Sequence, residues 1–487
     1  MPSLTRREFC AAPAVLKGLS KSKPNLLLLM SDQHRGDCFG ADGNRHAHTP
    51  VLDRLARDGV RFRHAYSSTP TCTPARAGLL TGCSPWTHGM LGYGRVAAQY
   101  PVELPAAIRA QGYQTLGVGK MHWAHQRNLH GFHRTILDES GRAESPDFRS
   151  DYRAWFASEA PGLNPDATGI GFNDYKGGAY QLPERLHPTR WTADVASRFI
   201  DSYSAAEPFF LKVSFARPHS PYDPPQRWWD FFSKREMPRP FVAPWASKYE
   251  PRNSTRDDIW HGRVSEAETR AARIGYYGAV SFVDEQIGRI VESLENKRIL
   301  DETFIVYISD HGDMTGDHNL WRKSYAYEPS ARIPMIVRGP GASRGRVEDA
   351  PAEIRDVLPT LLAAAGGSIP AQVEGQNLLA LQREWIDLEH DVCYSPANHW
   401  TAVTDGRRKY IYHAQTGEEQ FFDLSQDPNE LNDIALSSPE TAAWRARMAA
   451  HLEPRGEAWV KGGRLMPRPK SNLYSPNYPR PQAASVK

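Results

Sequence analysis

The stretch Asn25-Leu26-Leu27-Leu28-Leu29-Met30 is a continuous run of apolar side chains that is followed by the polar segment Ser31-Asp32-Gln33-His34-Arg35. An apolar run of this length is typical of a strand buried on both faces, as in a parallel sheet. Open α/β sheets bind ligands beyond the carboxyl ends of their strands. The stretch therefore predicts an α/β fold in which Asp32 is placed to bind a metal ion. For this segment alone, an aspartate in a turn or helix cap is the alternative.

Further strands with the same pattern are predicted over residues 113–119, 209–215 and 304–309. Helices are predicted between the strands, over residues 49–59, 104–111, 192–203, 265–295 and 356–365. Polar residues again follow the strands, namely Lys120 and His122, then His219, and then Asp310 and His311. Each alone has an ordinary explanation as a surface or loop residue. Together they predict a polar cluster at one edge of the sheet, in which Asp310 and His311 are a candidate pair of metal ligands.

The stretch Thr71-Cys72-Thr73-Pro74-Ala75-Arg76-Ala77-Gly78-Leu79-Leu80-Thr81-Gly82 predicts a short helix. Pro74 suits the first turn of this helix and Gly82 suits its end. Cys72 then lies at the N-terminus, where unpaired N–H groups favour negative charge, and Arg76 follows one turn later. The pattern indicates an anion site, whereas a structural cysteine is the plainer interpretation of Cys72 alone.

The composition is that of an ordinary globular protein. The 487 residues are enough for one large α/β domain and a smaller one. A formal net charge of +3 gives no reason to expect binding to nucleic acid or to a membrane surface. No segment approaches the roughly 20 apolar residues of a membrane span. The five cysteines show neither a metal-binding nor a disulfide pattern, so no disulfide bond is required.

The two ends of the chain differ from its middle. Thr5-Arg6-Arg7-Glu8-Phe9 looks like a twin-arginine signal, so we expect residues 1–22 to be an export signal or a disordered tail. The protein would then be periplasmic or secreted, with a cytoplasmic location as the alternative. Residues 23–385 are predicted to form the α/β domain. Residues 386–487 are predicted to form a smaller subdomain on an antiparallel sheet, because short strands joined by turns recur there.

Residues 130–188 are predicted to be a long irregular insertion, rich in Gly, Pro, Asp and Arg. Insertions of this length in a compact enzyme are often functional. We expect this one to form the wall that selects the substrate, with a plain surface loop as the alternative.

Several short motifs occur in the order found in type I sulfatases, a family that the chain resembles after residue 23. Cys72-x-Pro-x-Arg followed by Leu-Thr-Gly is similar to the family's signature, and Gly119-Lys120-Met121-His122 is similar to its Gly-Lys-x-His motif. The other matches are Asp32, Pro218-His219-Ser220-Pro221, Ser309-Asp310-His311-Gly312, Lys323, and tail segments at 406–410 and 423–428.

The resemblance implies an alkaline-phosphatase-like fold, which is a large mixed, mostly parallel sheet sandwiched by helices, with a C-terminal α+β subdomain. It also implies that a formylglycine-generating maturation enzyme converts Cys72 to formylglycine, whose hydrate is the nucleophile. The family's other catalytic residues match Arg76, Lys120, His122, His219 and Lys323. Of these, His122 would take the proton that releases sulfate, and His219 or Lys323 would protonate the leaving oxygen.

A divalent metal ion held by Asp32, Asp310, His311 and the converted Cys72 is a further implication. Many sulfatases have a second acid where this chain has Gln33, and they often have asparagine in place of His311. Gln33 would therefore bind the metal through its amide oxygen or not touch it at all. Ca²⁺ prefers oxygen ligands and is the first choice, while the imidazole ligand leaves Mn²⁺ and Zn²⁺ open.

The preferred function is the hydrolysis of a sulfate ester, with a sulfated carbohydrate favoured over choline sulfate or an aryl sulfate. A phosphonate monoester or phosphodiester hydrolase would share the fold, the modified cysteine and the Asp-His metal pair. A non-catalytic protein that binds sulfated glycans would keep the pocket with an unmodified Cys72. Candidate contacts to the substrate, chosen by position, are His130, Trp321, Arg322, His399 and Trp400.

Overall fold

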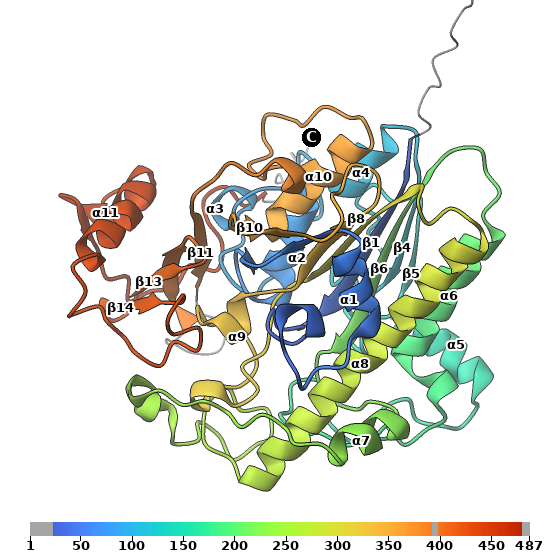
Figure 1. Cartoon of the computed structure of the whole chain (residues 1–487), viewed down its shortest axis with the longest axis horizontal. Helices are drawn as coiled ribbons and strands as arrows, with labels where there is room; N and C mark the ends of the chain where they lie inside the picture. Colours follow the sequence, from blue (N-terminus) through green and yellow to red (C-terminus); the bar gives the residue numbers. More distant parts are fainter. Residues whose placement is uncertain (1–22, 392–397, 480–487) are drawn as a thin grey trace, which may run out of the picture.

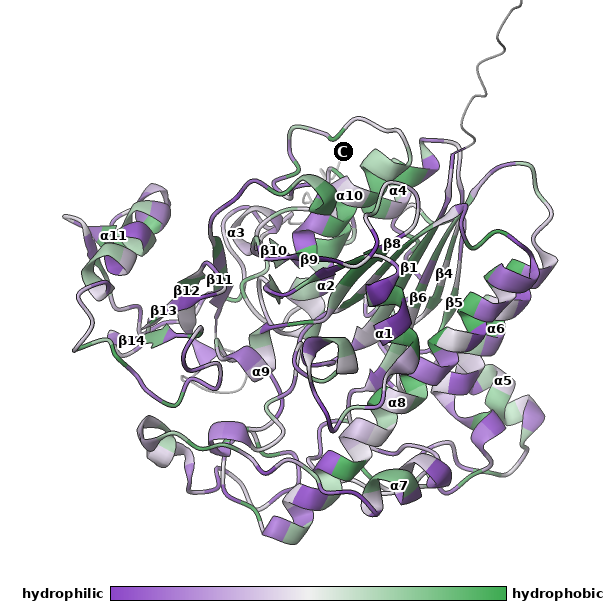
Figure 2. Ribbon diagram, viewed as in Figure 1, coloured by the Kyte–Doolittle hydropathy of each residue, from purple (hydrophilic) through white to green (hydrophobic). Residues whose placement is uncertain are grey.

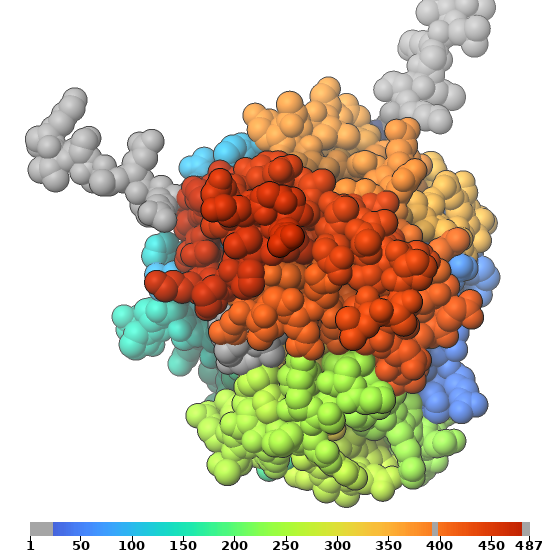
Figure 3. Space-filling view, turned by 90° about the vertical axis from the view of Figure 1, so that its left-hand side faces the viewer, coloured from blue at the N-terminus to red at the C-terminus, as the bar shows by residue number. Residues whose placement is uncertain are grey.

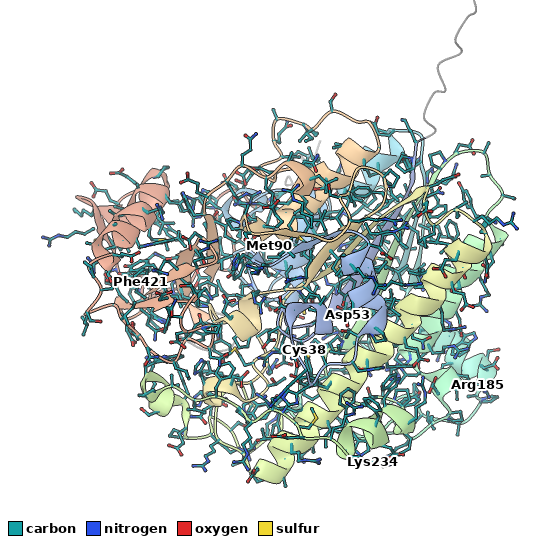
Figure 4. The ribbon with its side chains drawn as sticks, in the orientation of Figure 1. Cys38, Asp53, Met90, Arg185, Lys234 and Phe421 are labelled. Carbon is teal, nitrogen blue, oxygen red and sulfur yellow. The ribbon has the colours of Figure 1, made fainter. Side chains whose placement is uncertain are left out.

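The structure is a computed structural model that describes residues 23–391 and 398–479 (Figure 1). The predicted export signal or tail at residues 1–22 lies outside the described residues. Within them, no helix is both long and apolar enough to cross a membrane. Cys38, Cys72 and Cys83 are buried free thiols, and Figure 4 labels Cys38 in the segment after β1.

An eight-stranded sheet forms the centre of the molecule, in the order β5-β4-β6-β1-β7-β8-β2-β9. Neighbouring strands are parallel except at β8, which is antiparallel to both β7 and β2. The strands are β1 (Asn25–Asp32), β2 (Val60–Phe62), β4 (Gln114–Gly119), β5 (Arg134–Leu137), β6 (Phe209–Pro218), β7 (Thr303–Ser309), β8 (Met335–Arg338) and β9 (Arg346–Glu348). The prediction of a mixed, mostly parallel sheet is confirmed, and the apolar run is its central strand β1.

Helices cover both faces of this sheet (Figure 1). Because side chains of a strand alternate between faces, Leu26 and Leu28 pack in one core and Leu27 and Leu29 in the other. The first core is covered by α2 (Cys72–Thr81), α4 (Leu104–Arg109) and α10 (Val357–Ala364). The second is covered by α1 (Pro50–Arg57), α5 (Asp151–Glu159), α6 (Pro188–Ser202) and α8 (Glu266–Asn296). In Figure 2 the strands of the sheet are green for most of their length, as expected of strands buried on both faces.

The C-terminal part of the chain forms an antiparallel sheet in the order β11-β12-β13-β14. Its elements are β11 (Ile386–His390), β12 (Trp400–Thr404), β13 (Arg408–His413), β14 (Glu418–Asp423) and the helix α11 (Thr441–Leu452). Figure 3 shows these orange to red segments packed against the rest of the molecule. Buried Lys409 of β13 joins this part to the main domain through an ion pair of 2.6 Å with Glu328 of α9 (Glu328–Ala331), and it also pairs with Glu430 of its own part at 2.9 Å.

Shorter elements complete the fold. The helices are α3 (Pro85–His88), α7 (Gln226–Ser233) and α9 (Glu328–Ala331). Two small two-stranded sheets pair β3 (Ala65–Tyr66) with β10 (Ala352–Glu353), and β15 (Val460–Lys461) with β16 (Arg464–Leu465).

The structure differs from the sequence prediction in two places. The alternation of side chains over residues 60–66 predicts one short strand, but these residues form β2 and β3, which belong to different sheets. Residues 130–188 are not irregular throughout, because they contain the edge strand β5 and the helix α5. An edge strand has a neighbour on one side only and tolerates polar residues, such as the exposed Arg134. Because β5 therefore lacks a continuous apolar run, the sequence pattern did not indicate it.

Candidate active site

Four predicted site residues come together because four neighbouring parallel strands end at the same edge of the sheet. Asp32 is the last residue of β1, and Asp310 directly follows β7. Lys120 directly follows β4, and His219 directly follows β6. All four side chains are buried. The expected clustering of polar residues at the carboxyl ends of the strands is therefore seen in the structure.

Cys72 is the first residue of α2, and all ten residues of this helix are buried. The helix ends at Gly82, which has φ of 68° and whose N–H donates to the carbonyl of Gly78, as the sequence predicted. The Cys72 Sγ lies 3.2 Å from His311 Nε2 and 3.8 Å from an oxygen of Asp32. The helix therefore presents its N-terminal side chain to the polar edge of the sheet.

Asp32, Cys72, Asp310 and His311 form a group that could hold a metal ion. One ligand atom from each lies within 4.8 Å of the others. The His311 Nδ1 lies 2.9 Å from the Gly312 carbonyl, so Nδ1 carries the proton and Nε2 is left to bind a cation. Two carboxylates, one imidazole and an oxygen in place of Sγ are suitable ligands for a divalent cation, so the donor set fits the predicted metal.

Arg76 holds the two carboxylates of this group in place. Its Nε donates to Asp310 at 3.0 Å and its Nη2 to Asp32 at 2.9 Å. Its Nη1 donates to the Lys120 carbonyl at 2.6 Å and to the Ser214 hydroxyl at 3.1 Å. A guanidinium with this many partners is fixed in orientation. Its role in holding an anion at the Cys72 position stays a prediction.

Lys120 contributes a second buried cation, with its Nζ 2.5 Å from Asp32. Its backbone position depends on Gly119, which has φ of 91° and whose missing Cβ would lie 2.1 Å from the Ser214 carbonyl oxygen. Burial raises the pKa of Asp32, but the charges of the neighbouring cations, Lys120 first and then Arg76, outweigh it and hold that pKa well below its usual value. Asp32 is therefore ionised and ready to bind a cation.

Lys323 is another buried cation of the site. Its Nζ lies 2.7 Å from His219 Nε2 and 2.7 Å from Gln33 Oε1. The His219 Nδ1 lies 2.8 Å from the Ser220 carbonyl, so Nδ1 carries the proton and Nε2 accepts from Lys323. Burial, reinforced by the charge of Lys323, holds the pKa of His219 well below its usual value, so the imidazole is neutral.

The Gln33 side chain is fixed by Lys323 on its oxygen and by Asp313 on its nitrogen. Its backbone N–H donates to Asp310 at 3.0 Å, and its φ of 73° turns the chain sharply after β1. The amide oxygen therefore has a partner other than a metal, and its role as a metal ligand stays a prediction.

His122 lies beside Lys120 with a free ring nitrogen. Its Nε2 is 3.3 Å from the Tyr93 hydroxyl, and its Nδ1 is buried without a hydrogen-bond partner. Burial, with the charges of Lys120 and Arg142, holds the pKa of His122 well below its usual value. The imidazole is neutral and can accept a proton.

The Cys72 thiol is easier to ionise than an ordinary cysteine. Burial and the charge of Asp32 raise its pKa, but the charges of nearby cations, Lys323 first and then Lys120, outweigh them and bring it to about 7. Negative charge is therefore stabilised at the position where the nucleophile is expected.

The sequence reasoning missed three residues that shape the site. Asp313 is buried and accepts hydrogen bonds from Gln33 and Tyr222. Glu139 is buried and accepts the N–H groups of Met121 and His122 at 3.0 Å. Asp313 directly follows Asp310-His311-Gly312, and Tyr222 directly follows Pro218-His219-Ser220-Pro221, so the positions of both could have signalled a role, whereas Glu139 adjoins no such motif.

The candidate substrate contacts are mostly occupied within the protein. His130 is buried with its Nδ1 2.7 Å from Glu103, and Trp321 is buried with its indole N–H donating to the Gly262 carbonyl. The Trp400 indole N–H donates to the Ser324 carbonyl, and His399 lies 3.2 Å from Asp391. An Arg322 nitrogen donates to the Asp258 carbonyl. Direct contact of these residues with a substrate stays a prediction.

A nucleophile position at a helix N-terminus, with two carboxylates at the strand ends and several buried cations around them, defines an enzyme of α/β architecture that acts on anionic esters. The family described as sulfatase matches residues 24–368, and the family described as N-sulphoglucosamine sulphohydrolase, C-terminal, matches residues 316–457. An arylsulfatase from Clostridium perfringens is 37% identical over 472 residues, covering 91% of this chain and 97% of the relative.

Two further proteins show the same relationship. A choline-sulfatase from Rhizobium meliloti is 30% identical and covers 91% of this chain and 88% of its own length. The crystal structure of a phosphonate monoester hydrolase of Agrobacterium radiobacter superposes with a TM-score of 0.72 at 26% identity, covering 89% of this chain and 96% of that one. The chain belongs to the sulfatase family, and it is a sulfuric ester hydrolase with the alkaline-phosphatase-like fold.

Proposed function

We propose that this enzyme hydrolyses a sulfate ester of a carbohydrate through a formylglycine hydrate made from Cys72, next to a divalent cation that is Ca²⁺ in the first instance. The observation that carries the proposal is the buried group of Asp32, Cys72, Asp310 and His311, whose ligand atoms lie within 4.8 Å of one another. The match of residues 316–457 to a family described by sulphoglucosamine supports a carbohydrate substrate.

The metal ion would be held by Asp32, Asp310, His311 and an oxygen at position 72. When bound, it lowers the pKa of a neighbouring hydroxyl, so that a hydrate becomes a nucleophile near neutral pH. Arg76, already fixed by Asp32 and Asp310, orients the hydrate.

Lys120 and Lys323 face this position as two buried cations and bind the sulfate oxygens, whose charge changes as the ester bond breaks. A hydrate oxygen attacks sulfur, and the bond from sulfur to the leaving oxygen breaks. The leaving oxygen takes a proton from Lys323, because the Nε2 of the neighbouring His219 is an acceptor in this arrangement.

Release of sulfate then needs a base that removes the proton of the second hydroxyl at position 72. The neutral His122 takes the proton of the remaining hydroxyl at position 72, the carbon–oxygen bond to sulfate breaks, and the aldehyde re-forms. Water adds to the aldehyde and restores the hydrate. This second step uses a group that serine would lack, since only a geminal diol has a second hydroxyl.

Peptide mass analysis of protein co-expressed with a maturation enzyme tests the proposal directly. We expect formylglycine at position 72 in active protein, and no turnover by Cys72→Ala despite an unchanged melting temperature. Active protein with an ordinary thiol at position 72 would contradict the mechanism.

Assays of the same converted protein distinguish the sulfatase from two alternatives, a phosphonate hydrolase and a non-catalytic glycan-binding protein. Equal rates on an aryl sulfate and on a phenyl phosphonate would favour the phosphonate hydrolase. This alternative is considered because the Agrobacterium phosphonate monoester hydrolase has a similar fold. Tight binding of sulfated glycans without turnover by fully converted protein would favour the binding protein. The family and its sulfatase relatives support sulfate as the substrate group.

A further inference from the structure

A loop of the 130–188 insertion is anchored directly on the active site. Glu139, two residues after β5, accepts the N–H groups of Met121 and His122 with its carboxylate, at 3.0 Å in each case. The loop returns through Glu144, whose N–H donates to the Gln126 side chain at 2.8 Å. Its position relative to the catalytic residues is therefore fixed by hydrogen bonds at both ends.

The loop turns so tightly that it sets the direction of Arg142. Ser140 and Gly141 both have positive φ, 51° and 74°, and the Arg142 N–H donates back to the Glu139 carbonyl at 3.0 Å. A Cβ at Gly141 would lie 2.6 Å from the Phe172 ring, so only glycine fits there. The Arg142 guanidinium carbon lies 6.0 Å from the centre of the same ring.

The Arg142 side chain is a cation without an anionic partner. Its Nη1 is buried and makes no hydrogen bond, and none of the carboxylates in residues 23–391 and 398–479 forms an ion pair with it. The loop that carries it is anchored by Glu139 on the N–H groups of Met121 and His122, which places Arg142 close to the catalytic residues. In agreement, its charge helps to lower the pKa of Lys120, of His122 and of His219, in each case behind burial.

Burying a guanidinium nitrogen without a partner is unfavourable, and it is more so beside other cations. Two acids of the loop do not compensate it, because Asp138 and Glu139 are themselves buried and burial raises the pKa of each. The missing partner is therefore an anion that comes from outside the chain.

We propose that Arg142 is a specificity-determining residue that binds a second anionic group, a carboxylate or another sulfate, on the leaving-group side of the substrate. This inference rests on the proposed sulfatase function. The transferred sulfate already has Lys120 and Lys323 as proposed partners, whereas Arg142 comes from the insertion. The planar guanidinium matches either group with two parallel hydrogen bonds.

The test compares three sulfate esters that differ in one group: a sulfated monosaccharide without other charge, the same sugar with a carboxylate, and the same sugar with a second sulfate. We expect wild-type kcat/KM to be higher for one of the doubly charged esters. Arg142→Ala should lower kcat/KM for that ester about ten- to hundredfold more than for the singly charged one, as expected of a lost charge-assisted contact. The kcat/KM of Arg142→Lys for the doubly charged ester should fall between that of the wild type and that of Arg142→Ala.

Arg149→Ala is the matched control, because it removes an exposed arginine from the same loop. It should leave the ratio between the esters unchanged. Equal losses on all three esters, or a wild-type enzyme without preference for a second anion, would overturn the proposal for Arg142. A wild-type enzyme inactive on every sulfate ester would instead refute the proposed function.

Binding gives an independent measurement. Calorimetry with Cys72→Ala protein, which cannot turn over, should show tighter binding of the doubly charged ester, and this difference should disappear in Cys72→Ala/Arg142→Ala. If the difference persists in the double variant, Arg142 is not the group that recognises the second anion.

Discussion

Lys323→Met is expected to separate activity from stability. The Lys323 ammonium is buried, 3% exposed, and its partners are two neutral acceptors, His219 Nε2 and Gln33 Oε1, at 2.7 Å each. Removing it loses two charge-assisted hydrogen bonds of about 1.5–3 kcal/mol each. It also removes a buried charge whose desolvation costs several kcal/mol, and methionine fills most of the same volume. The two effects offset each other, so the free energy of unfolding should change by no more than about 2 kcal/mol.

The loss of activity should be much larger and should depend on the leaving group. Deleting one donor that acts in the transition state costs about 2.7–4 kcal/mol, or roughly a hundred- to thousandfold in kcat. Nitrophenolate is stable enough to leave without being protonated, whereas a sugar alkoxide needs a proton in order to leave. We therefore expect Lys323→Met to lose at least about tenfold more kcat/KM on a sugar sulfate than on 4-nitrophenyl sulfate.

Steady-state kinetics on both esters, with urea unfolding of the same preparations, provide the measurements. Lys234→Met is the control, since Lys234 is an exposed lysine at the end of α7 (Figure 4) and should change neither quantity. Identical losses of Lys323→Met on the two esters would show that Lys323 binds sulfate without donating the proton. Unfolding of this variant would refute the energetic argument.

Three more outcomes are expected. Ca²⁺ at a hundredfold excess over its Kd should stabilise the protein by about 2.7 kcal/mol and raise its Tm by about 3 °C, and differential scanning fluorimetry should show no such shift for Asp310→Asn. Glu139→Gln should lower kcat about tenfold, with a Tm close to that of the wild type, because an NH₂ group replaces the second oxygen that accepts the His122 N–H at 3.2 Å; an unchanged kcat would mean that this carboxylate does not position His122. Lys409→Met should lower the free energy of unfolding by about 3–5 kcal/mol in urea titrations, because it leaves Glu430 buried without its cation; a loss below about 1 kcal/mol would contradict this account.

Much of the fold and of the site follows from local patterns in the sequence. The apolar run at β1 identified the centre of the sheet, and its polar end identified Asp32. Parallel strands end at a common edge, so Lys120, His219 and Asp310 could be grouped without knowing the strand order. Gly82 and Pro74 gave the bounds of α2 nearly correctly, because helix ends have local chemical requirements.

The remaining features depend on contacts between distant segments and leave no local signal. Nothing near Glu139 shows that its carboxylate would hold the N–H groups of Met121 and His122. In the sequence Arg142 cannot be distinguished from the other arginines of the insertion, because the turn at Gly141 that orients it is seen only in the structure. The separation of β2 from β3 likewise depends on β10, which comes almost 300 residues later in the chain.

The complete burial of α2 limits when Cys72 can be oxidised under the proposed mechanism. No residue from Cys72 to Thr81 is accessible once the helix has docked, so an oxidising enzyme has to meet this segment while the polypeptide is still unfolded. Molecules that fold first keep a plain thiol and stay inactive for good, although their stability matches that of active ones. Rapid overexpression should therefore lower the specific activity of a preparation, and slower synthesis should restore it.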